Sequence, residues 1–134
     1  MINIKDWRGR TLLSSACKYG NFDIVKMLVA NGANVNTPDI CGVSPLMVAS
    51  KYQQYSIAKY LKNNGANIHA LDNYGKNIDL YVSNYNHDDY NYHAMYNLIC
   101  ESGVKTNYLG KNMNIESNYL NVSLFIHKLF QLKN

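Results

Sequence analysis

The stretch Thr11–Ala16 reads TLLSSA, and it returns 33 residues later as SPLMVA at Ser44–Ala49. A second stretch, GANVN at Gly32–Asn36, returns at the same step as GANIH at Gly65–His69. Two blocks that agree in both residue type and spacing indicate an internal repeat. A fixed period of this length is typical of a solenoid, in which each small unit buries its apolar face against the next. The sequence therefore predicts a stack of similar units.

A third unit follows from an Asp and a Gly that recur at the same step, at Asp6 and Gly9, Asp39 and Gly42, and Asp72 and Gly75. These blocks resemble ankyrin repeats, whose pattern runs D-x-x-G-x-T-P-L-H-x-A-A-x-x-G and then I-V-x-x-L-L-x-x-G-A-D-V-N. The resemblance covers about residues 2–107 and is specific in the first two units. The third unit is degenerate and stays in register at these positions: Asp72, Gly75, Met95, Tyr96, Ile99, Cys100 and Gly103.

The resemblance implies an all-α ankyrin-repeat solenoid of stacked helix pairs with short β-turn connections and a C-terminal capping helix. We expect a single domain over residues 1–134, divided into repeat one at about 6–38, repeat two at about 39–71, degenerate repeat three at about 72–107, and a divergent C-terminal cap at 108–134. Within that cap, an apolar segment predicts a helix inside Asn118–Leu132. Met1 falls inside the turn that would precede repeat one, so we expect no N-terminal capping repeat.

Residues that favour helix ends support this division. Thr11, Ser44 and Asn77 stand 33 residues apart, and each side chain can accept a hydrogen bond from the free N–H groups of a helix start. Pro45 follows as the favoured first helical residue. A glycine is expected in the left-handed conformation just after each helix pair, at Gly32, Gly65 and Gly103.

The interval from cap to glycine locates an insertion in repeat three. It is 21 residues in the first two units, but Asn77 to Gly103 spans 26, which leaves five extra residues. We expect them in the loop between the helices, within Asn84–Tyr92. Asp79 also falls at a buried position of the repeat, where a lone carboxylate would be costly. We expect a one-residue slip that turns Ile78 inward and leaves Asp79 in the first turn of the helix.

Composition limits the class of protein. The chain has 134 residues, enough for one domain with a continuous core. Its abundant Asn, Tyr and Lys resemble the composition of short ankyrin proteins of giant DNA viruses, and to a lesser degree those of AT-rich intracellular bacteria. No signal peptide is evident, and no apolar stretch reaches the ~20 residues of a membrane span. We therefore expect no membrane association.

Three cysteines at unrelated spacings give no disulfide framework. Cys17 and Cys100 fall at core positions of the repeat, whereas Cys41 falls in a turn. An exposed thiol suits a reducing compartment, so we expect a cytoplasmic protein, acting in the host cell if the chain is viral.

Catalytic chemistry finds no support in the sequence. The one cluster that resembles a metal site, His87, Asp88, Asp89 and His93, matches no zinc or calcium spacing and fits a solvated loop. His69 replaces Asn36 in the repeat turn. No glycine-rich phosphate loop and no activated nucleophile is evident. We expect no enzyme activity, no cofactor and no metal.

Repeat phase predicts a binding surface, because equivalent residues of stacked units form columns. In ankyrin proteins, partners generally meet the turn tips and the inner face of the first helices. Carried onto this chain, the resemblance implies the following protein-binding residues: Trp7, Arg8, Arg10, Lys18, Tyr19, Ile40, Val43, Lys51, Tyr52, Tyr74, Lys76 and Tyr85. The column Tyr19, Tyr52 and Tyr85 could bind a partner or pack within the fold, and the sequence leaves both open.

The sequence thus predicts a monomeric, non-enzymatic protein–protein interaction module with an unidentified partner. The net charge of +4 slightly favours an acidic surface on that partner. One alternative is a structural or decaying remnant without a specific partner, although large residues such as Trp7 and Ile40 at turn tips argue against drift. Another is weak nucleic-acid binding through a stripe that includes Arg8, Lys18 and Lys51. Because the net charge is small and no nucleic-acid motif is present, solvated lysines are favoured.

Overall fold

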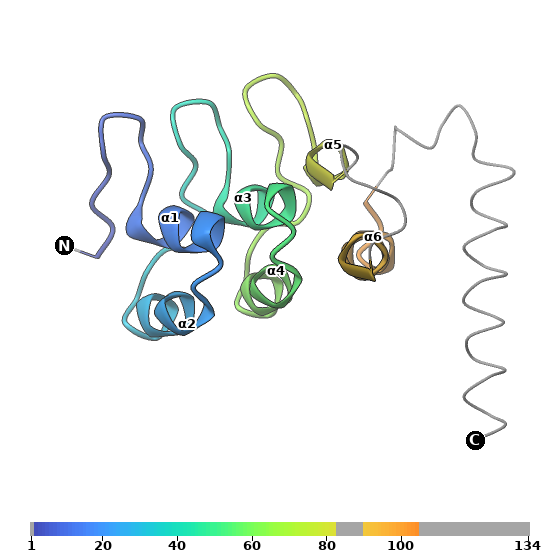
Figure 1. Ribbon diagram of the computed structural model, residues 1–134. Coiled ribbons are helices and arrows are strands. Elements are labelled where there is room, and N and C mark those ends of the chain that lie inside the picture. Colours follow the sequence, from blue (N-terminus) through green and yellow to red (C-terminus); the bar gives the residue numbers. More distant parts are fainter. Residues whose placement is uncertain (1, 83–89, 105–134) are drawn as a thin grey trace, which may run out of the picture.

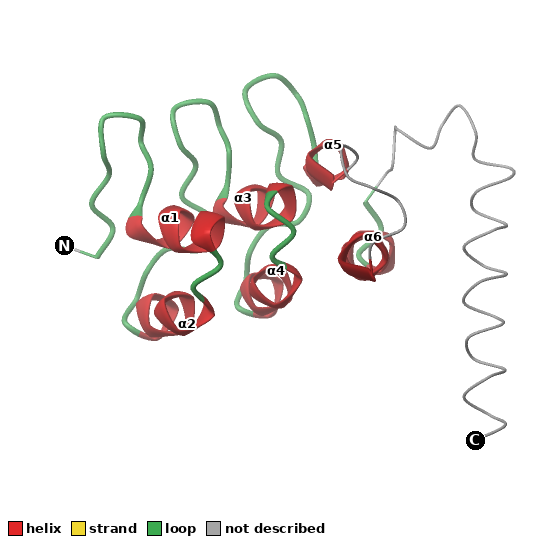
Figure 2. Cartoon of the chain, in the orientation of Figure 1, coloured by secondary structure: helices red, strands yellow, loops and turns green. Residues whose placement is uncertain are grey.

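The computed structural model describes residues 2–82 and 90–104, and these residues contain helices and loops but no strand (Figures 1 and 2). The helices follow one another in three pairs: α1 (Leu12–Tyr19), α2 (Phe22–Ala30), α3 (Pro45–Lys51), α4 (Tyr55–Asn63), α5 (Ile78–Val82) and α6 (Tyr90–Glu101). The predicted all-α solenoid of stacked helix pairs is confirmed. The helix expected within Asn118–Leu132 lies outside the described residues.

The helices form two layers. The first helices of the pairs, α1, α3 and α5, lie side by side in one layer, and α2, α4 and α6 form the other (Figure 1). Three long loops project from the first layer, and we call them finger 1 (residues 3–11), finger 2 (residues 36–44) and finger 3 (residues 69–77). Each finger leads directly into the first helix of its pair, so the fingers and this layer present one common surface.

Local signals start and stop the helices where the sequence predicts. The Thr11 hydroxyl accepts from the Ser14 N–H at 3.3 Å, and the Ser44 hydroxyl accepts from the Met47 N–H at 3.2 Å. Pro45 is the first residue of α3. Glycines with positive φ follow the second helices, at Gly32 (91°), Gly65 (92°) and Gly103 (74°). Side chains other than glycine rarely adopt this conformation. After Gly32 and Gly65 the chain continues into fingers 2 and 3.

A ladder of asparagines fixes the spacing of the units. The Asn36 side-chain oxygen accepts from the Asn67 N–H at 2.7 Å, and the Asn3 side-chain oxygen accepts from the Asn34 N–H at 2.8 Å. The two bonds span the same 31 residues, so Asn3 is the counterpart of Asn36 one unit earlier. His69 takes this position in the third unit, as predicted.

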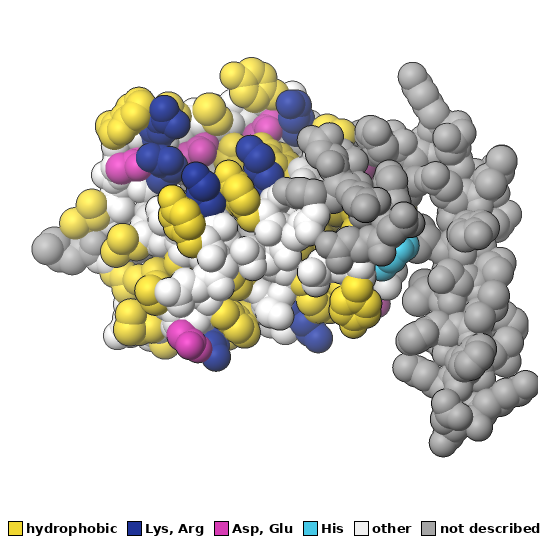
Figure 3. Space-filling model, viewed as in Figure 1, with side chains coloured by type: hydrophobic (Ala, Val, Ile, Leu, Met, Phe, Trp, Pro, Cys, Tyr) yellow, Lys and Arg dark blue, Asp and Glu magenta, His cyan; other side chains and the backbone are white. Residues whose placement is uncertain are grey.

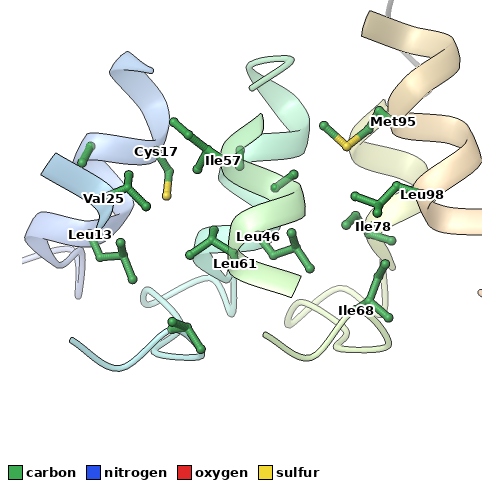
Figure 4. Close-up of a cluster of buried hydrophobic side chains, with 14 of the residues drawn as sticks. Leu13, Cys17, Val25, Leu46, Ile57, Leu61, Ile68, Ile78, Met95 and Leu98 are labelled. Atoms are coloured by element: carbon green, nitrogen blue, oxygen red, sulfur yellow. The ribbon is translucent and has the colours of Figure 1, made fainter. Parts of the chain in front are cut away.

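One continuous core runs between the two layers (Figure 4). Leu13, Cys17, Val25 and Leu61 are at most 1% exposed. Ile24 is 40% exposed, whereas Ile57, its counterpart in repeat phase, is 2% exposed. Ile57 lies in α4, which packs against α2, whereas Ile24 lies in α2, the first second-layer helix among the described residues.

The third helix pair departs from two predictions about its helices. Tyr90–Tyr92 belong to α6 rather than to a loop, and the rest of the expected loop lies outside the described residues. At 12 residues, α6 is three residues longer than α2 and α4, which have 9 each, so the helix takes up much of the extra length. The predicted slip is wrong: α5 starts one residue after Asn77, as α1 and α3 start one residue after their caps.

Two side chains of this pair also differ from expectation. Ile78 is buried as predicted, at 1% exposed, but Asp79 is buried as well, at 4%. Asp79 therefore keeps the core register, in the first turn of α5, where the helix dipole favours its charge. Cys100, predicted in the core, is exposed, because it lies next to Ile99 near the end of α6 and Ile99 takes the inward position.

Candidate functional site

The three fingers share one turn, built around the recurring aspartate. In finger 2 the Asp39 Oδ1 accepts from the N–H groups of Cys41 at 2.8 Å and of Val43 at 2.9 Å. The same pair of bonds forms in finger 1, from Arg8 and Arg10 to Asp6, and in finger 3, from Tyr74 and Lys76 to Asp72. One carboxylate oxygen per finger is thus engaged by the backbone, and the residues between the bonds are held at the tip.

Hydrogen bonds lower the pKa values of two of these carboxyl groups, Asp6 and Asp72. At Asp6, the backbone N–H of Arg10 is the main cause, and burial opposes it. At Asp72, burial alone would raise the pKa, but the Tyr81 hydroxyl, which donates to Oδ2 at 2.7 Å, and the two backbone N–H groups outweigh it. Burial and the same bond to Asp72 raise the pKa of Tyr81. Both carboxylates are therefore charged at neutral pH.

Backbone hydrogen bonds join neighbouring fingers. The Ile40 N–H donates to the Arg8 carbonyl at 2.9 Å, and one unit on the Asn73 N–H donates to the Cys41 carbonyl at 2.9 Å. The Asn73 side-chain amide adds a bond to the Ile40 carbonyl at 2.8 Å. Each finger is therefore braced by its neighbour, which fixes the positions of the tip side chains before any partner binds.

Exposed aromatic rings alternate with cations on the surface that the fingers and first helices share (Figure 3). Trp7, Tyr19 and Tyr74 are 77–78% exposed, and Tyr52 is 40% exposed. We call this surface the aromatic–cation face and define it by eight residues: Trp7, Arg8, Lys18, Tyr19, Lys51, Tyr52, Tyr74 and Lys76.

Cations of the face lie over its rings. At the tip of finger 1, the Arg8 guanidinium lies 4.5 Å from the Trp7 ring centroid. Farther along, the Lys18 ammonium lies 5.5 Å from the Tyr19 centroid and 5.7 Å from the Tyr52 centroid, so it bridges two repeats. Lys51 and Lys76 make similar contacts to Tyr52 and Tyr74, at 5.7 and 5.9 Å. Such contacts orient exposed side chains without removing their charge.

The remaining predicted binding residues lie around this face. Ile40 is 61% exposed at the tip of finger 2, and Val43 is half-buried at its base. Arg10 is half-buried, and its side chain pairs with Asp6 at 2.8 Å. Tyr85 lies outside the described residues, so the third member of the tyrosine column stays a prediction.

Two hollows lie between the fingers. The first, about 170 Å³, separates fingers 1 and 2 and is lined by Arg10, Ser14, Ser15, Lys18, Tyr19, Asp39, Val43 and Val48. The second, about 270 Å³, separates fingers 2 and 3 and is lined by Cys41, Val43, Lys51, Asp72, Tyr74, Lys76, Leu80 and Tyr81. Each hollow thus combines two cations, an exposed tyrosine and the flank of Val43.

Sequence reasoning missed two features of these hollows. Tyr81 lies one turn inside α5, and its bond to Asp72 appears only when finger 3 folds back over that helix. Cys41 was placed in a turn, but its position in the second hollow depends on finger 3 as well. Repeat phase could have located both residues near the fingers, but it could not have identified the residues that they contact.

Nothing in the described part of the chain forms a metal centre: no three His, Cys, Asp or Glu side chains there gather as ligands. His87, Asp88 and Asp89 lie outside the described residues. None of the helices α1–α6 combines the length and apolar character that a membrane span requires.

The repeated unit consists of a finger, two helices and a turn, and hydrogen bonds join neighbouring fingers. Such a chain is a solenoid of helical repeats, and its fingers present a preformed face. A family model for ankyrin repeats (3 copies) matches residues 1–72, more than half of the chain. The chain belongs to the ankyrin repeat family. No curated protein matches it. Ankyrin repeat domains are generally protein–protein interaction modules and typically non-enzymatic scaffolds.

Proposed function

We propose that this chain binds a protein partner through the aromatic–cation face. The observation that carries the proposal is the alternation of exposed rings and cations along braced fingers. Large aromatic side chains and arginine are enriched among residues that dominate binding energy, because they bury much area at little cost in conformational entropy. Trp7, Arg8 and Tyr74 stand at solvated finger tips, where they contribute little to folding.

Charge supports the same surface. In the described part of the chain the ion pairs are Arg10 with Asp6 and Lys26 with Asp23. Four cations of the face form no ion pair there, although the charge of Lys76 acts on Asp72: Arg8, Lys18, Lys51 and Lys76. Their charges are available to a partner and would steer it during association.

The alternatives fit less well. A decaying remnant would not keep the same Asp-centred turn and the same bonds between fingers in all three units. A nucleic-acid site would present a continuous positive track, but here Asp39 and Asp72 line the hollows between the cations.

The cellular setting is part of the proposal. Cys41 is a free, exposed thiol in finger 2, which suits a reducing cytoplasm. The composition resembles that of giant DNA virus proteins, and a viral origin stays a prediction. Action in the host-cell cytoplasm stays a prediction as well. The monomeric state and the division into units at 6–38, 39–71, 72–107 and 108–134 also stay predictions.

The test is affinity capture of a partner from cytosol, followed by binding measurements with two tyrosine variants. Tyr52→Ala should weaken binding by at least about 1 kcal/mol, because this ring lies at the centre of the face. The matched control is Tyr90→Ala, since Tyr90 is 80% exposed on α6, in the second layer. Unchanged affinity of Tyr52→Ala together with a lower melting temperature would show that this tyrosine packs within the fold instead.

A further inference from the structure

We infer that the face recognises an extended acidic segment of its partner, with Asp or Glu at every third residue. This inference rests on the proposed function and adds the chemistry and the conformation of what binds. It follows from three features of the face: the pairing of cations around each hollow, the state of the nearby carboxylates, and the spacing of equivalent lysines.

Each hollow holds one cation from a finger and one from the end of a helix. Arg10, which also pairs with Asp6, and Lys18 line the first hollow, and Lys76 and Lys51 line the second. Val43 contributes to both hollows and forms the apolar wall between them. The two hollows are therefore repeated receptors for the same kind of group, a carboxylate next to an apolar or neutral residue.

The aspartates of the hollows weaken this preference but do not reverse it, because two cations and one aspartate line each hollow. The Oδ1 atoms of Asp39 and Asp72 each accept two backbone N–H groups, and Asp72 also accepts from Tyr81. Asp72 is thereby engaged at both carboxylate oxygens, and Asp39 at one. Lys18 and Lys51, by contrast, contact only ring faces in the described part of the chain. A carboxylate from outside would therefore meet lysines that form no ion pair in the described part of the chain.

The spacing of the lysines selects the conformation of the segment. Lys18 and Lys51 each lie in the last turn of a first-layer helix, α1 or α3, and these two helices pack against each other. Packed helices lie about 8–10 Å apart. A polyproline II segment has three residues per turn and rises about 3.1 Å per residue, so residues i and i+3 lie on one side about 9 Å apart. In a β-strand, same-side residues lie about 6.6 Å apart, which fits worse.

The experiment selects random peptides from a displayed library on the full chain and reads the enriched sequences. We expect Asp or Glu to be enriched at i and i+3, with apolar or neutral residues between them. For a selected peptide, Lys18→Glu and Lys51→Glu should each weaken binding about tenfold at low ionic strength, and added salt should reduce the difference.

Lys62→Glu is the matched control, because Lys62 lies in the last turn of a helix, as Lys18 and Lys51 do, but in second-layer α4. It should change the affinity less than about twofold. Moving one acidic residue of the peptide from i+3 to i+2 should weaken binding, and equal affinity of the two peptides would overturn the inferred spacing.

Three results would overturn the inference as a whole. The enriched peptides could lack acidic residues and bind Lys18→Glu and Lys51→Glu as tightly as the unchanged chain, yet lose affinity for Tyr52→Ala. In that case the proposed function stands and this inference fails. If no peptide is enriched, or none responds to a substitution on the face, a linear acidic segment is ruled out as the ligand. If an oligothymidylate binds more tightly than any peptide and competes for the face, both proposals fail.

Discussion

Leu61→Ala should remove a large part of the stability of the array. Leu61 is 0% exposed in α4, the second-layer helix that lies between α2 and α6, so its side chain belongs to the core shared by all three pairs. The substitution deletes three carbon-centred groups at about 0.8 kcal/mol each, or about 2.4 kcal/mol of transfer free energy. The cavity left behind raises the cost within the range of about 2–5 kcal/mol known for buried leucines.

Urea unfolding, followed by the helical circular dichroism signal, measures this loss. Leu12→Ala is the matched control: the same substitution in a helix, at a residue that is 61% exposed, should cost less than about 0.5 kcal/mol. Because a small domain holds only about 5–15 kcal/mol in total, a Leu61→Ala protein that does not fold while Leu12→Ala does gives the same answer. Similar losses for the two variants would refute the continuous core.

Two further predictions concern the fingers. The pKa of Asp72 in the folded chain lies below its ordinary value of 3.8, so its contribution to stability is present above about pH 4 and should be lost as the pH falls through the folded pKa. Urea midpoints measured against pH should show this loss of stability. In Asp72→Asn, the share of the pH dependence that comes from Asp72 should be absent. Gly42→Ala should destabilise the chain more than Gly75→Ala. Both glycines have positive φ (79° and 75°), but a Cβ at Gly42 would lie 2.5 Å from the Asn73 side chain, whereas one at Gly75 meets nothing within 4 Å. Equal melting temperatures of the two alanine variants would contradict the close contact between fingers 2 and 3.

Local signals predicted most of the fold. The caps at Thr11 and Ser44, Pro45 and the positive-φ glycines act within a few residues of themselves, so one sequence is enough to find them. Ile24 shows the limit of such reasoning. It matches Ile57 in repeat phase, yet its burial depends on whether a neighbouring helix pair lies beside it.

The candidate site was predictable to a similar degree. Repeat phase placed Trp7 and Tyr74 at exposed turn tips, and both are exposed; for Tyr19 it left burial within the fold open. It could not reveal that Lys18 lies over rings of two different repeats, since that contact depends on the distance between α1 and α3. It also could not show that the finger aspartates use their hydrogen-bonding capacity on backbone N–H groups. The acidic character inferred for the partner therefore depends on these contacts of Lys18 and of the finger aspartates, which only the structure shows.

The central claim, that the aromatic–cation face binds the partner, is tested most directly by mapping the contact on the isotope-labelled full chain. Backbone amide chemical shifts are recorded while a selected acidic peptide is added. The largest changes should fall on finger tips and first-layer helix ends, at Arg8, Tyr19, Tyr52 and Tyr74, while α2 and α4 stay unaffected. Changes concentrated on α2 and α4, or confined to residues remote from the fingers, would contradict the account.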